Sequence, residues 1–201
     1  MVLSAMDREV EVLKFEKKLG VDVARYGGDR SAFIVRHDNK VIRKEVMTGQ
    51  NLMNIAGMVM NIAKEEDIRA ENIFIDVIGY GAGVVDRLRE QGWLVQGVNV
   101  ASSPINKEQF ANTRAELFFK LRDWLKVGNI PKDDDFLELT SIKYYFNSKG
   151  QLQLEAKEDI KNRGLKSPDI GDALALTFAI TDNLGNFVMP RNVGGVHWDY
   201  Y

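Results

Sequence analysis

The sequence predicts an α/β domain with a mixed β-sheet flanked by helices, and two features of its patterning carry this prediction. Near the N-terminus, three short segments rich in Val, Ile and Phe follow one another with only short connections between them. Further along, apolar strand-like segments alternate with segments whose apolar residues recur at helical spacing. Strands joined by tight connections pair antiparallel, whereas strands separated by a helix usually pair in parallel. We therefore expect a three-strand antiparallel meander extended by parallel strands.

The three opening strands are expected at Leu19 to Ala24, Ser31 to Arg36 and Val41 to Met47. Residues 37–40 form a polar tetrapeptide that supplies the turn between the second and third strands. Residues 1–17, which precede the meander, are rich in charged side chains and are expected to form a short helix or a linker.

Helices and strands then alternate. Apolar residues at helical spacing predict a helix from Leu52 to about Glu66, followed by an apolar strand at 72–77. A glycine-rich turn at 79–83 leads into a second helix, and Trp93 to Val98 is expected to be the fifth strand. An amphipathic helix is predicted from Thr113 to Val127.

The C-terminal third is expected to contain a short helix at 136–142, a hairpin that pairs 144–146 with 152–155, and a last helix from Pro168 to about Thr181. The predicted order is β-β-β-α-β-α-β-α, then the hairpin and a helix. We expect a linker or extension at residues 1–18, one domain at 19–184 and a C-terminal tail at 185–201 whose role the pattern does not indicate.

Composition excludes several classes of site. The 201 residues include no cysteine, which excludes disulfides, thiolate zinc sites and cysteine nucleophiles. No segment resembles a signal peptide or is apolar for long enough to span a bilayer, so a cytosolic protein without a membrane partner is expected. The net charge of -2, from 27 Lys+Arg and 29 Asp+Glu, argues against a nucleic-acid partner unless some of the acids bind cations.

Three aspartates stand where a carboxylate is costly. Asp22 lies within the first apolar strand, Asp76 ends the strand at 72–77, and Asp172 opens an apolar stretch in the last helix. Burial of an ionised carboxylate costs several kcal/mol of free energy unless the carboxylate is paired or binds a metal. One such acid is commonly a turn or helix cap, but three together favour a site for divalent cations, which prefer carboxylate oxygens.

Two further aspartates are weaker candidates. We expect the last helix to have Ser167 as its N-cap and Pro168 as its first residue, so Asp169 has an ordinary role beside the helix dipole and is a possible supporting residue. Asp172 lies one turn on and is the better ligand. Asp29 is expected in a hairpin turn, close to Asp22 if the first two strands pair.

Four basic residues precede the last helix and are candidates for contact with a phosphate backbone if Asp172 lines the site: Lys157, Lys161, Arg163 and Lys166. A solvated charged surface explains them equally well. The glycines at 79, 81 and 83 suit the entry to a helix better than a nucleotide site, because they do not complete the dinucleotide-binding pattern.

Taken in order, these residues resemble the nuclease domain of phage terminase large subunits. Each motif is loose, but their succession from about Leu19 to Ile180 is specific. The segments that carry the resemblance are Asp22 with Gly27-Gly28-Asp29-Arg30-Ser31, Phe74 to Asp86, Asn112 to Leu117, Leu137 to Thr140, Leu154 to Asp159, and Ser167 to Leu174.

The resemblance implies a ribonuclease H-like fold and a metal-dependent endonuclease that cuts double-stranded viral DNA during genome packaging. Asp22, Asp76 and Asp172 match the family's catalytic, metal-binding triad, and Asp29 and Asp169 match additional acids. Two divalent cations, Mg²⁺ or Mn²⁺, are implied as cofactors. The implied partners are DNA, an ATPase motor domain, the small terminase subunit and the portal protein, and the implied location is the cytoplasm of an infected bacterium.

The sequence departs from the whole terminase subunit in one respect. It contains no G-x-x-x-x-G-K-[ST] phosphate-binding loop, and a motor domain does not fit in the residues before Leu19. We therefore expect an isolated nuclease domain with residues 1–18 as the end of a linker, in preference to a stand-alone relative.

Three alternatives stay open. A Holliday-junction resolvase or transposase core has the same class of fold, and its last helix can also carry two acids three residues apart. A sugar-kinase or actin-like nucleotide-binding domain shares a strand-borne Asp and Gly-rich turns but needs two such domains. A catalytically silent adaptor on the same fold would have acids that bind no metal.

Overall fold

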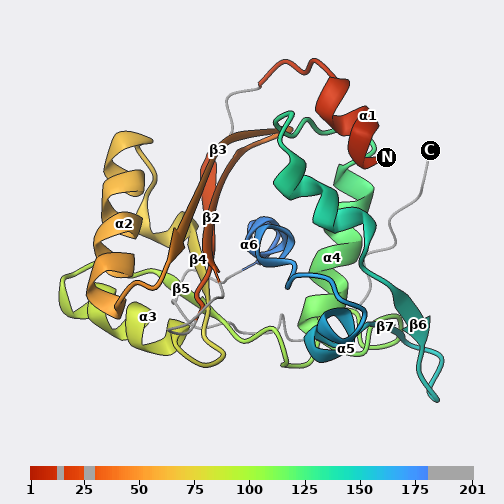
Figure 1. Cartoon of the computed structure of the whole chain (residues 1–201). Coiled ribbons are helices and arrows are strands. Elements are labelled where there is room, and N and C mark those ends of the chain that lie inside the picture. The colour runs from red at the N-terminus through yellow and green to blue at the C-terminus, as the bar shows by residue number, and fades with distance from the viewer. Residues whose placement is uncertain (13–15, 25–29, 181–201) are drawn as a thin grey trace, which may run out of the picture.

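The computed structural model describes residues 1–12, 16–24 and 30–180. A central five-stranded sheet has helices α2 and α3 on one face and helices α4 and α6 on the other (Figure 1). The strands are β1 (Lys17–Asp22), β2 (Arg30–His37), β3 (Lys40–Thr48), β4 (Ile73–Asp76) and β5 (Gln96–Val98). The main helices are α2 (Leu52–Glu65), α3 (Gly81–Glu90), α4 (Thr113–Trp124) and α6 (Asp169–Leu176).

Smaller elements complete the fold. They are α1 (Val2–Asp7), the 3₁₀ helices η1 (Ala70–Asn72) and η2 (Asp134–Thr140), the hairpin strands β6 (Tyr144–Phe146) and β7 (Leu152–Leu154), and α5 (Lys157–Asn162). The hairpin and α5 lie beyond α4 and α6, on the side of the molecule away from α2 (Figure 1). None of the helices in the described part of the chain is long and apolar enough to cross a membrane.

The sheet confirms the predicted mixture of pairings. Its order is β3-β2-β1-β4-β5, with β1–β2 and β2–β3 antiparallel and β1–β4 and β4–β5 parallel. In the β1–β4 register Leu19 lies opposite Ile73, so the two strands run side by side toward the same edge of the sheet. Asp22 and Asp76, their last residues, therefore end at that edge.

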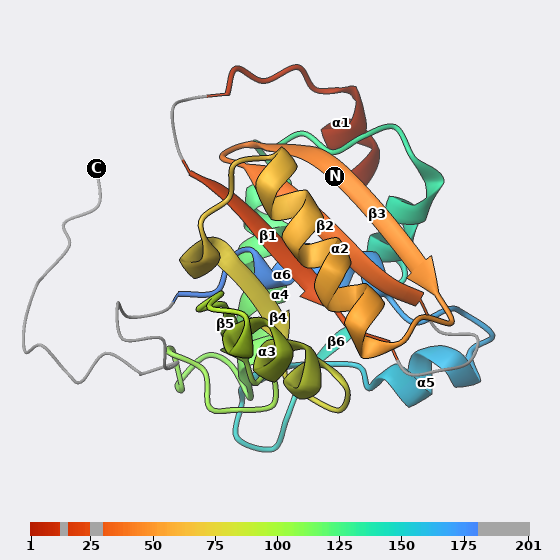
Figure 2. The same cartoon turned by 90° about the vertical axis from the view of Figure 1, so that its left-hand side faces the viewer.

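Alternation along the strands divides the apolar residues into two cores. Leu19, Val21 and Phe33 are buried against α2 and α3, which cover this face of the sheet in Figure 2. Ile34 and Phe74 belong to the other core, with α4 and α6. The opposite face of β1, toward α6, carries Gly20 and Asp22, which alternate along the strand with Leu19 and Val21.

Helix α6 packs directly on the sheet at Gly20. A β-carbon on this residue would lie 1.9 Å from the carbonyl oxygen of Ala173, so only glycine permits this contact. All residues of α6 are buried. The close packing places Asp172, the neighbour of Ala173, over the strand that ends at Asp22.

The last helix is shorter than predicted. Pro168, not Ser167, is its N-cap, and it ends at Leu176 rather than near Thr181, although the apolar pattern continues to Ile180. The amides of Thr177, Phe178 and Ala179 donate to the carbonyl oxygens three residues before them, so the α-helix changes to a tighter turn at this end. Arg36 on β2 donates hydrogen bonds to the hydroxyl (2.8 Å) and carbonyl (2.9 Å) oxygens of Thr177 and so holds this turn against the sheet.

Helix α5 is an additional finding, because only Ile160 is buried in it and the sequence offers no apolar periodicity there. Helix α1 falls within residues 1–17, where a short helix or a linker was expected. In α1, Val2 and Ala5 are buried, and the Ala5 carbonyl accepts a hydrogen bond from the amide of Ile130. Part of the expected linker therefore packs on the domain. The predicted tail at 185–201 lies outside the described residues, as does Asp29.

The contact at Gly20 makes a prediction about stability. Gly20→Ala should destabilise the domain by at least about 2 kcal/mol, because the added methyl group meets backbone and not a movable side chain. Gly57→Ala is the matched control, since an added β-carbon in the middle of α2 meets nothing within 4 Å. That change should be neutral or stabilise by up to about 1 kcal/mol. Urea unfolding measures both, and equal stability of the two variants would contradict the close packing of α6 on β1.

Candidate active site

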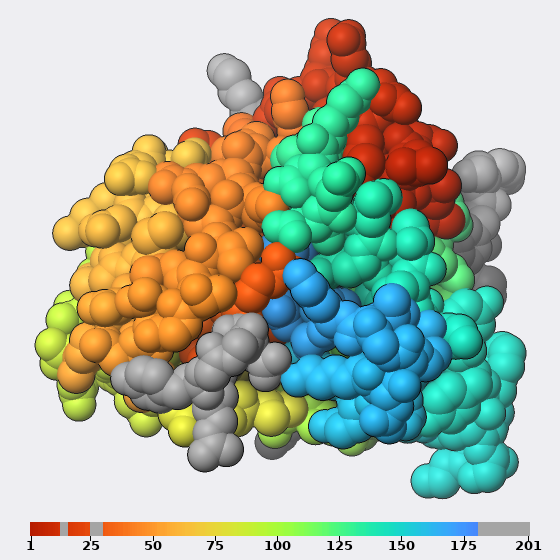
Figure 3. All heavy atoms as spheres, in the orientation of Figure 1, coloured from red at the N-terminus to blue at the C-terminus, as the bar shows by residue number. Residues whose placement is uncertain are grey.

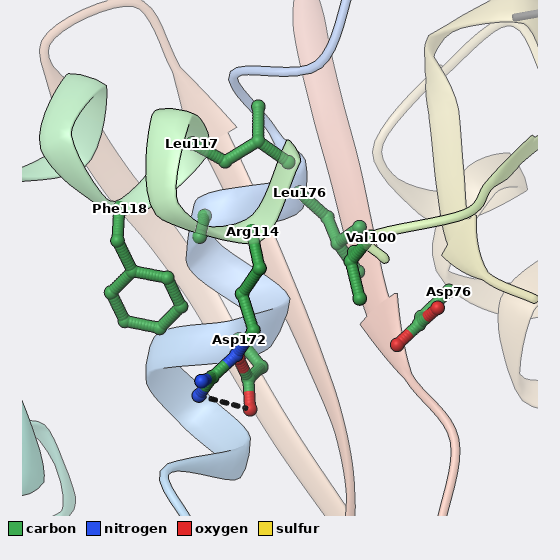
Figure 4. Close-up of a pocket in the computed structure, with 8 residues that line it drawn as sticks. Asp76, Val100, Arg114, Leu117, Phe118, Asp172 and Leu176 are labelled. Carbon is green, nitrogen blue, oxygen red and sulfur yellow. Dashed lines mark hydrogen bonds and ion pairs between the residues drawn. The ribbon is translucent and has the colours of Figure 1, made fainter. Parts of the chain in front are cut away.

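Three carboxylates predicted from the sequence meet at one edge of the sheet. Asp22 ends β1, Asp76 ends the neighbouring parallel strand β4, and Asp172 comes from the first turn of α6, which packs across β1. Asp22 and Asp172 are buried, with 7% and 8% of their surface exposed, whereas Asp76 is half-buried. Figure 4 shows Asp76 and Asp172 on opposite sides of a pocket that Arg114 also lines.

Lys157 lies between two of these carboxylates. Its Nζ atom is 2.8 Å from Oδ2 of Asp172 and 3.4 Å from Oδ2 of Asp22. Burial lowers the pKa of Lys157, but the carboxylates of Asp172 and Asp22 outweigh burial and raise it above the ordinary lysine value. The ammonium group is therefore charged and holds Asp22 and Asp172 together.

A second cation, Arg114 on α4, forms an ion pair with Asp172. Its Nε atom donates to Oδ1 of Asp172 at 2.8 Å, and its Nη1 atom donates to the carbonyl oxygen of Glu155 at 3.3 Å (Figure 4 draws the Arg114–Asp172 contact). Burial opposes the ionised form of Asp172, but Arg114 and Lys157 reverse this effect and lower the pKa of that carboxyl group. Asp172 is thus ionised.

The negative charges of Asp22 and Asp76 are less fully compensated by nearby cations than that of Asp172. Burial raises the pKa of Asp22 to about 7, opposed by Lys157 and reinforced by Asp172 and Asp76. Burial also raises the pKa of Asp76 to about 6, although its Oδ1 atom accepts a hydrogen bond from the amide of Ile78 at 3.0 Å. Three carboxylates share two cations here, so the ionised cluster has an excess of negative charge.

The donor set suits a divalent cation such as Mg²⁺ or Mn²⁺, because carboxylate oxygens from three elements converge. Burial disfavours the ionised form of two of these carboxylates, Asp22 and Asp76. As the side chains stand, the described part of the chain contains no group of three acidic or histidine residues that could hold a metal ion. In this arrangement the ammonium group of Lys157 lies between Asp22 and Asp172.

Asp169 belongs to a neighbouring network. It is buried, and its Oδ2 atom lies 3.6 Å from Nε of Arg30, which also contacts Glu138 at 3.4 Å and Asp135 at 2.9 Å. Glu138 accepts a hydrogen bond of 2.7 Å from the amide of Gly171, yet burial raises the pKa of Glu138 to about 8. This network holds the beginning of α6, and with it Asp172, against η2.

The four basic residues predicted as candidates for phosphate contact differ in their surroundings. Lys157 contacts the carboxylates, and Arg163 is bound to Glu155 through two hydrogen bonds of 2.6 and 2.7 Å. Lys161 and Lys166 are exposed. The segment from α5 to α6 that carries them lies at the surface between the sheet and the hairpin, blue in Figure 3.

Sequence reasoning assigned no role to Arg114, Arg30 or Glu138. Each stands in a segment used for the family resemblance, and that was the only available signal. An arginine in the first turn of an amphipathic helix is ordinarily an exposed residue, so the enclosure of Arg114 depends on partners that come from distant segments of the chain.

No family model matches the sequence, and no curated protein matches it at a significant level. Solved structures do match. A variant nuclease domain of the large terminase subunit gp2 of bacterial virus Sf6, with manganese, has a TM-score of 0.73 at 22% identity over 82% of this chain and 88% of that chain.

The chain has the fold of phage terminase nuclease domains. The large terminase nuclease of thermophilic phage G20c, with bound magnesium, has a TM-score of 0.64 at 19% identity and covers 88% of this chain and 95% of its own. The large terminase nuclease domain of Thermus phage P74-26 has a TM-score of 0.61 at 18% identity over 82% of this chain and 78% of its own. The expected ribonuclease H-like fold is confirmed.

The raised pKa of Asp22 predicts a pH-dependent gain of stability on its neutralisation. Folding raises this pKa from 3.8 to about 7, so the folded state binds the proton more tightly than the unfolded state does. The resulting stabilisation is complete below about pH 4 and is lost as the pH rises through 7. Asp22→Asn should therefore unfold at a higher temperature than the wild type at pH 8, with a difference that shrinks toward pH 5.

Thermal unfolding followed by circular dichroism in EDTA measures this difference. Asp123→Asn is the control, because this exposed aspartate at the end of α4 has a pKa lowered by Lys126, so its replacement should bring no stabilisation. An Asp22→Asn variant that is less stable than the wild type at pH 8 would show that Lys157 compensates the charge of Asp22 in full.

Proposed function

We propose that this protein is a metal-dependent endonuclease that cuts double-stranded DNA during viral genome packaging, as the nuclease domain of a terminase large subunit. One observation carries the proposal. In the fold of terminase nuclease domains, Asp22, Asp76 and Asp172 converge from β1, β4 and α6 on one edge of the sheet, and two of them are kept from ready ionisation by burial.

Two divalent cations are the proposed cofactors, and Asp22, Asp76 and Asp172 are the residues that would hold them. Similar structures contain manganese or magnesium, which supports the use of such ions here. When bound, the ions supply an activated water and stabilisation of the leaving 3′ oxygen in displacement at phosphorus. Asp29 and Asp169 are proposed as supporting acids.

The residues of the chain prepare this chemistry in distinct ways. Asp172 is kept ionised by Arg114 and Lys157, whereas Asp22 and Asp76 release their protons only near neutral pH. Asp22 and Asp76 would hold the ions in their ionised form, and Lys157 would then have to leave its position between Asp22 and Asp172. The displaced ammonium group would then be available to a phosphate oxygen of DNA.

DNA is proposed to approach the edge of the sheet along α5. Lys161 and Lys166 are exposed at this surface and are proposed to contact phosphates, and Arg163, which is bound to Glu155, would have to leave that carboxylate to do so. By analogy with whole terminases, an ATPase motor domain, the small terminase subunit and the portal protein are the proposed partners, and the host cytoplasm is the proposed location. The same class of fold in resolvases and transposase cores makes a junction-specific nuclease the alternative.

Cleavage of supercoiled plasmid by the purified chain in Mn²⁺ or Mg²⁺ tests the proposal. We expect nicking and linearisation that EDTA abolishes. Asp172→Asn should reduce the rate at least about 100-fold, because this change removes a charged ligand while keeping the shape of the side chain. Asp123→Asn, an exposed change on α4, should cut like the wild type.

Two results would contradict the proposal. Equal cutting by Asp172→Asn and the wild type would place the chemistry elsewhere, and a folded protein that cuts in neither metal would favour the silent adaptor. Preference for four-way junctions over linear duplex would favour the resolvase alternative.

A further inference from the structure

Arg114 is a largely enclosed cation at the edge of the proposed site. It lies in the first turn of α4, its side chain is 13% exposed, and its guanidinium group stands 5.0 Å from the centre of the Phe118 ring. Burial lowers the pKa of an arginine, yet Asp172 outweighs this effect and raises the pKa of Arg114. The residue is therefore a permanent cation with a fixed location, whereas the side chain of Lys157 is more exposed, at 36%.

The contacts of Arg114 join three segments that are distant in the sequence. The side chain donates to the Asp172 carboxylate on α6 and to the carbonyl oxygen of Glu155, two residues before Lys157. Its backbone amide donates to the carbonyl oxygen of Val100 at 2.8 Å, just after β5. One residue thus connects the segment after β5, the segment that carries Lys157, and the helix that carries Asp172.

Arg114 donates to both oxygens of Asp172, from Nε to Oδ1 at 2.8 Å and from Nη2 to Oδ2 at 3.5 Å. Oδ2 also faces Nζ of Lys157 at 2.8 Å, and the same ammonium group lies 3.4 Å from Oδ2 of Asp22. Arg114 therefore holds the Asp172 carboxylate in the orientation that directs one oxygen toward the space shared with Asp22.

We propose that Arg114 is a positioning residue, which orients Asp172 so that its Oδ2 atom and Oδ2 of Asp22 face a single cation position. This inference rests on the proposed function, because it assigns a role within the same site. A residue of this kind contacts neither the cation nor the substrate. Its loss costs affinity for the cation because the ligand is no longer held in one orientation.

A purely electrostatic role for Arg114 predicts the opposite change in affinity for the cation. Arg114 carries a positive charge beside the proposed cation position, so removal of that charge alone would strengthen the binding of a divalent cation. Loss of orientation would weaken it. The direction of the change in affinity therefore separates the two roles, and a lysine at this position keeps the charge without the forked donor geometry that reaches Asp172 and Glu155 together.

The experiment is calorimetric titration of Mn²⁺ into the DNA-free protein at pH 8, for the wild type, Arg114→Gln and Arg114→Lys. We expect about 10- to 100-fold weaker binding for Arg114→Gln and no full rescue by Arg114→Lys. Arg122→Gln is the matched control, because Arg122 lies on the same helix, is exposed and contacts Asp123. The Arg122→Gln variant should bind Mn²⁺ with the affinity of the wild type.

Thermal unfolding of each variant shows whether it is folded. If Arg114→Gln does not fold, the Mn²⁺ affinity of Arg114→Lys, which retains an aliphatic chain and the charge, tests the positioning role. Wild-type or tighter affinity in the folded variants would overturn the positioning role while leaving the proposed function in place. A wild type that binds no Mn²⁺ and cuts no DNA would overturn both.

Discussion

The direct packing of α6 on β1 is the constraint on which the rest of this structure depends. Gly20 permits the backbone of the helix at Ala173 to touch the strand, and this contact carries Asp172 over the edge where β1 and β4 end. A bulkier residue at position 20 would lift the helix and separate Asp172 from Asp22. The same contact lets Arg36 and Glu138 hold the two ends of α6, so the helix is fixed along its whole length.

This packing creates an electrostatic problem that the site resolves only in part. Three carboxylates are gathered in a largely buried place, and Lys157 and Arg114 supply two positive charges. The two cations differ in kind. Arg114 is enclosed and bound to one carboxylate, whereas Lys157 bridges two carboxylates from a more exposed position. Under the proposed function, Arg114 would be a fixed cation that orients a ligand, and Lys157 would be a cation that leaves its position when metal ions bind.

The sequence predicted those parts of the fold and site that depend on local patterns. Apolar alternation and short turns located the meander, and an aspartate in an apolar run identified Asp22, Asp76 and Asp172, which the structure brings together. Contacts between distant residues were not predictable. Arg36 holds the end of α6 from another element, and Arg114 is enclosed only because Asp172 and the Glu155 carbonyl accept its hydrogen bonds. Lys157 was a candidate for phosphate contact or for a solvated surface, and its contacts with Asp22 and Asp172 depend on segments distant in the sequence.

The most direct test of the account is a crystal structure of the protein grown or soaked in Mn²⁺, with anomalous scattering used to locate the ion. The account predicts manganese within coordinating distance of Asp22 and Asp172, with Asp76 nearby and the ammonium group of Lys157 displaced from its position between the carboxylates. Manganese bound elsewhere, or a Lys157 ammonium group that stays between Asp22 and Asp172 at saturating Mn²⁺, would contradict it.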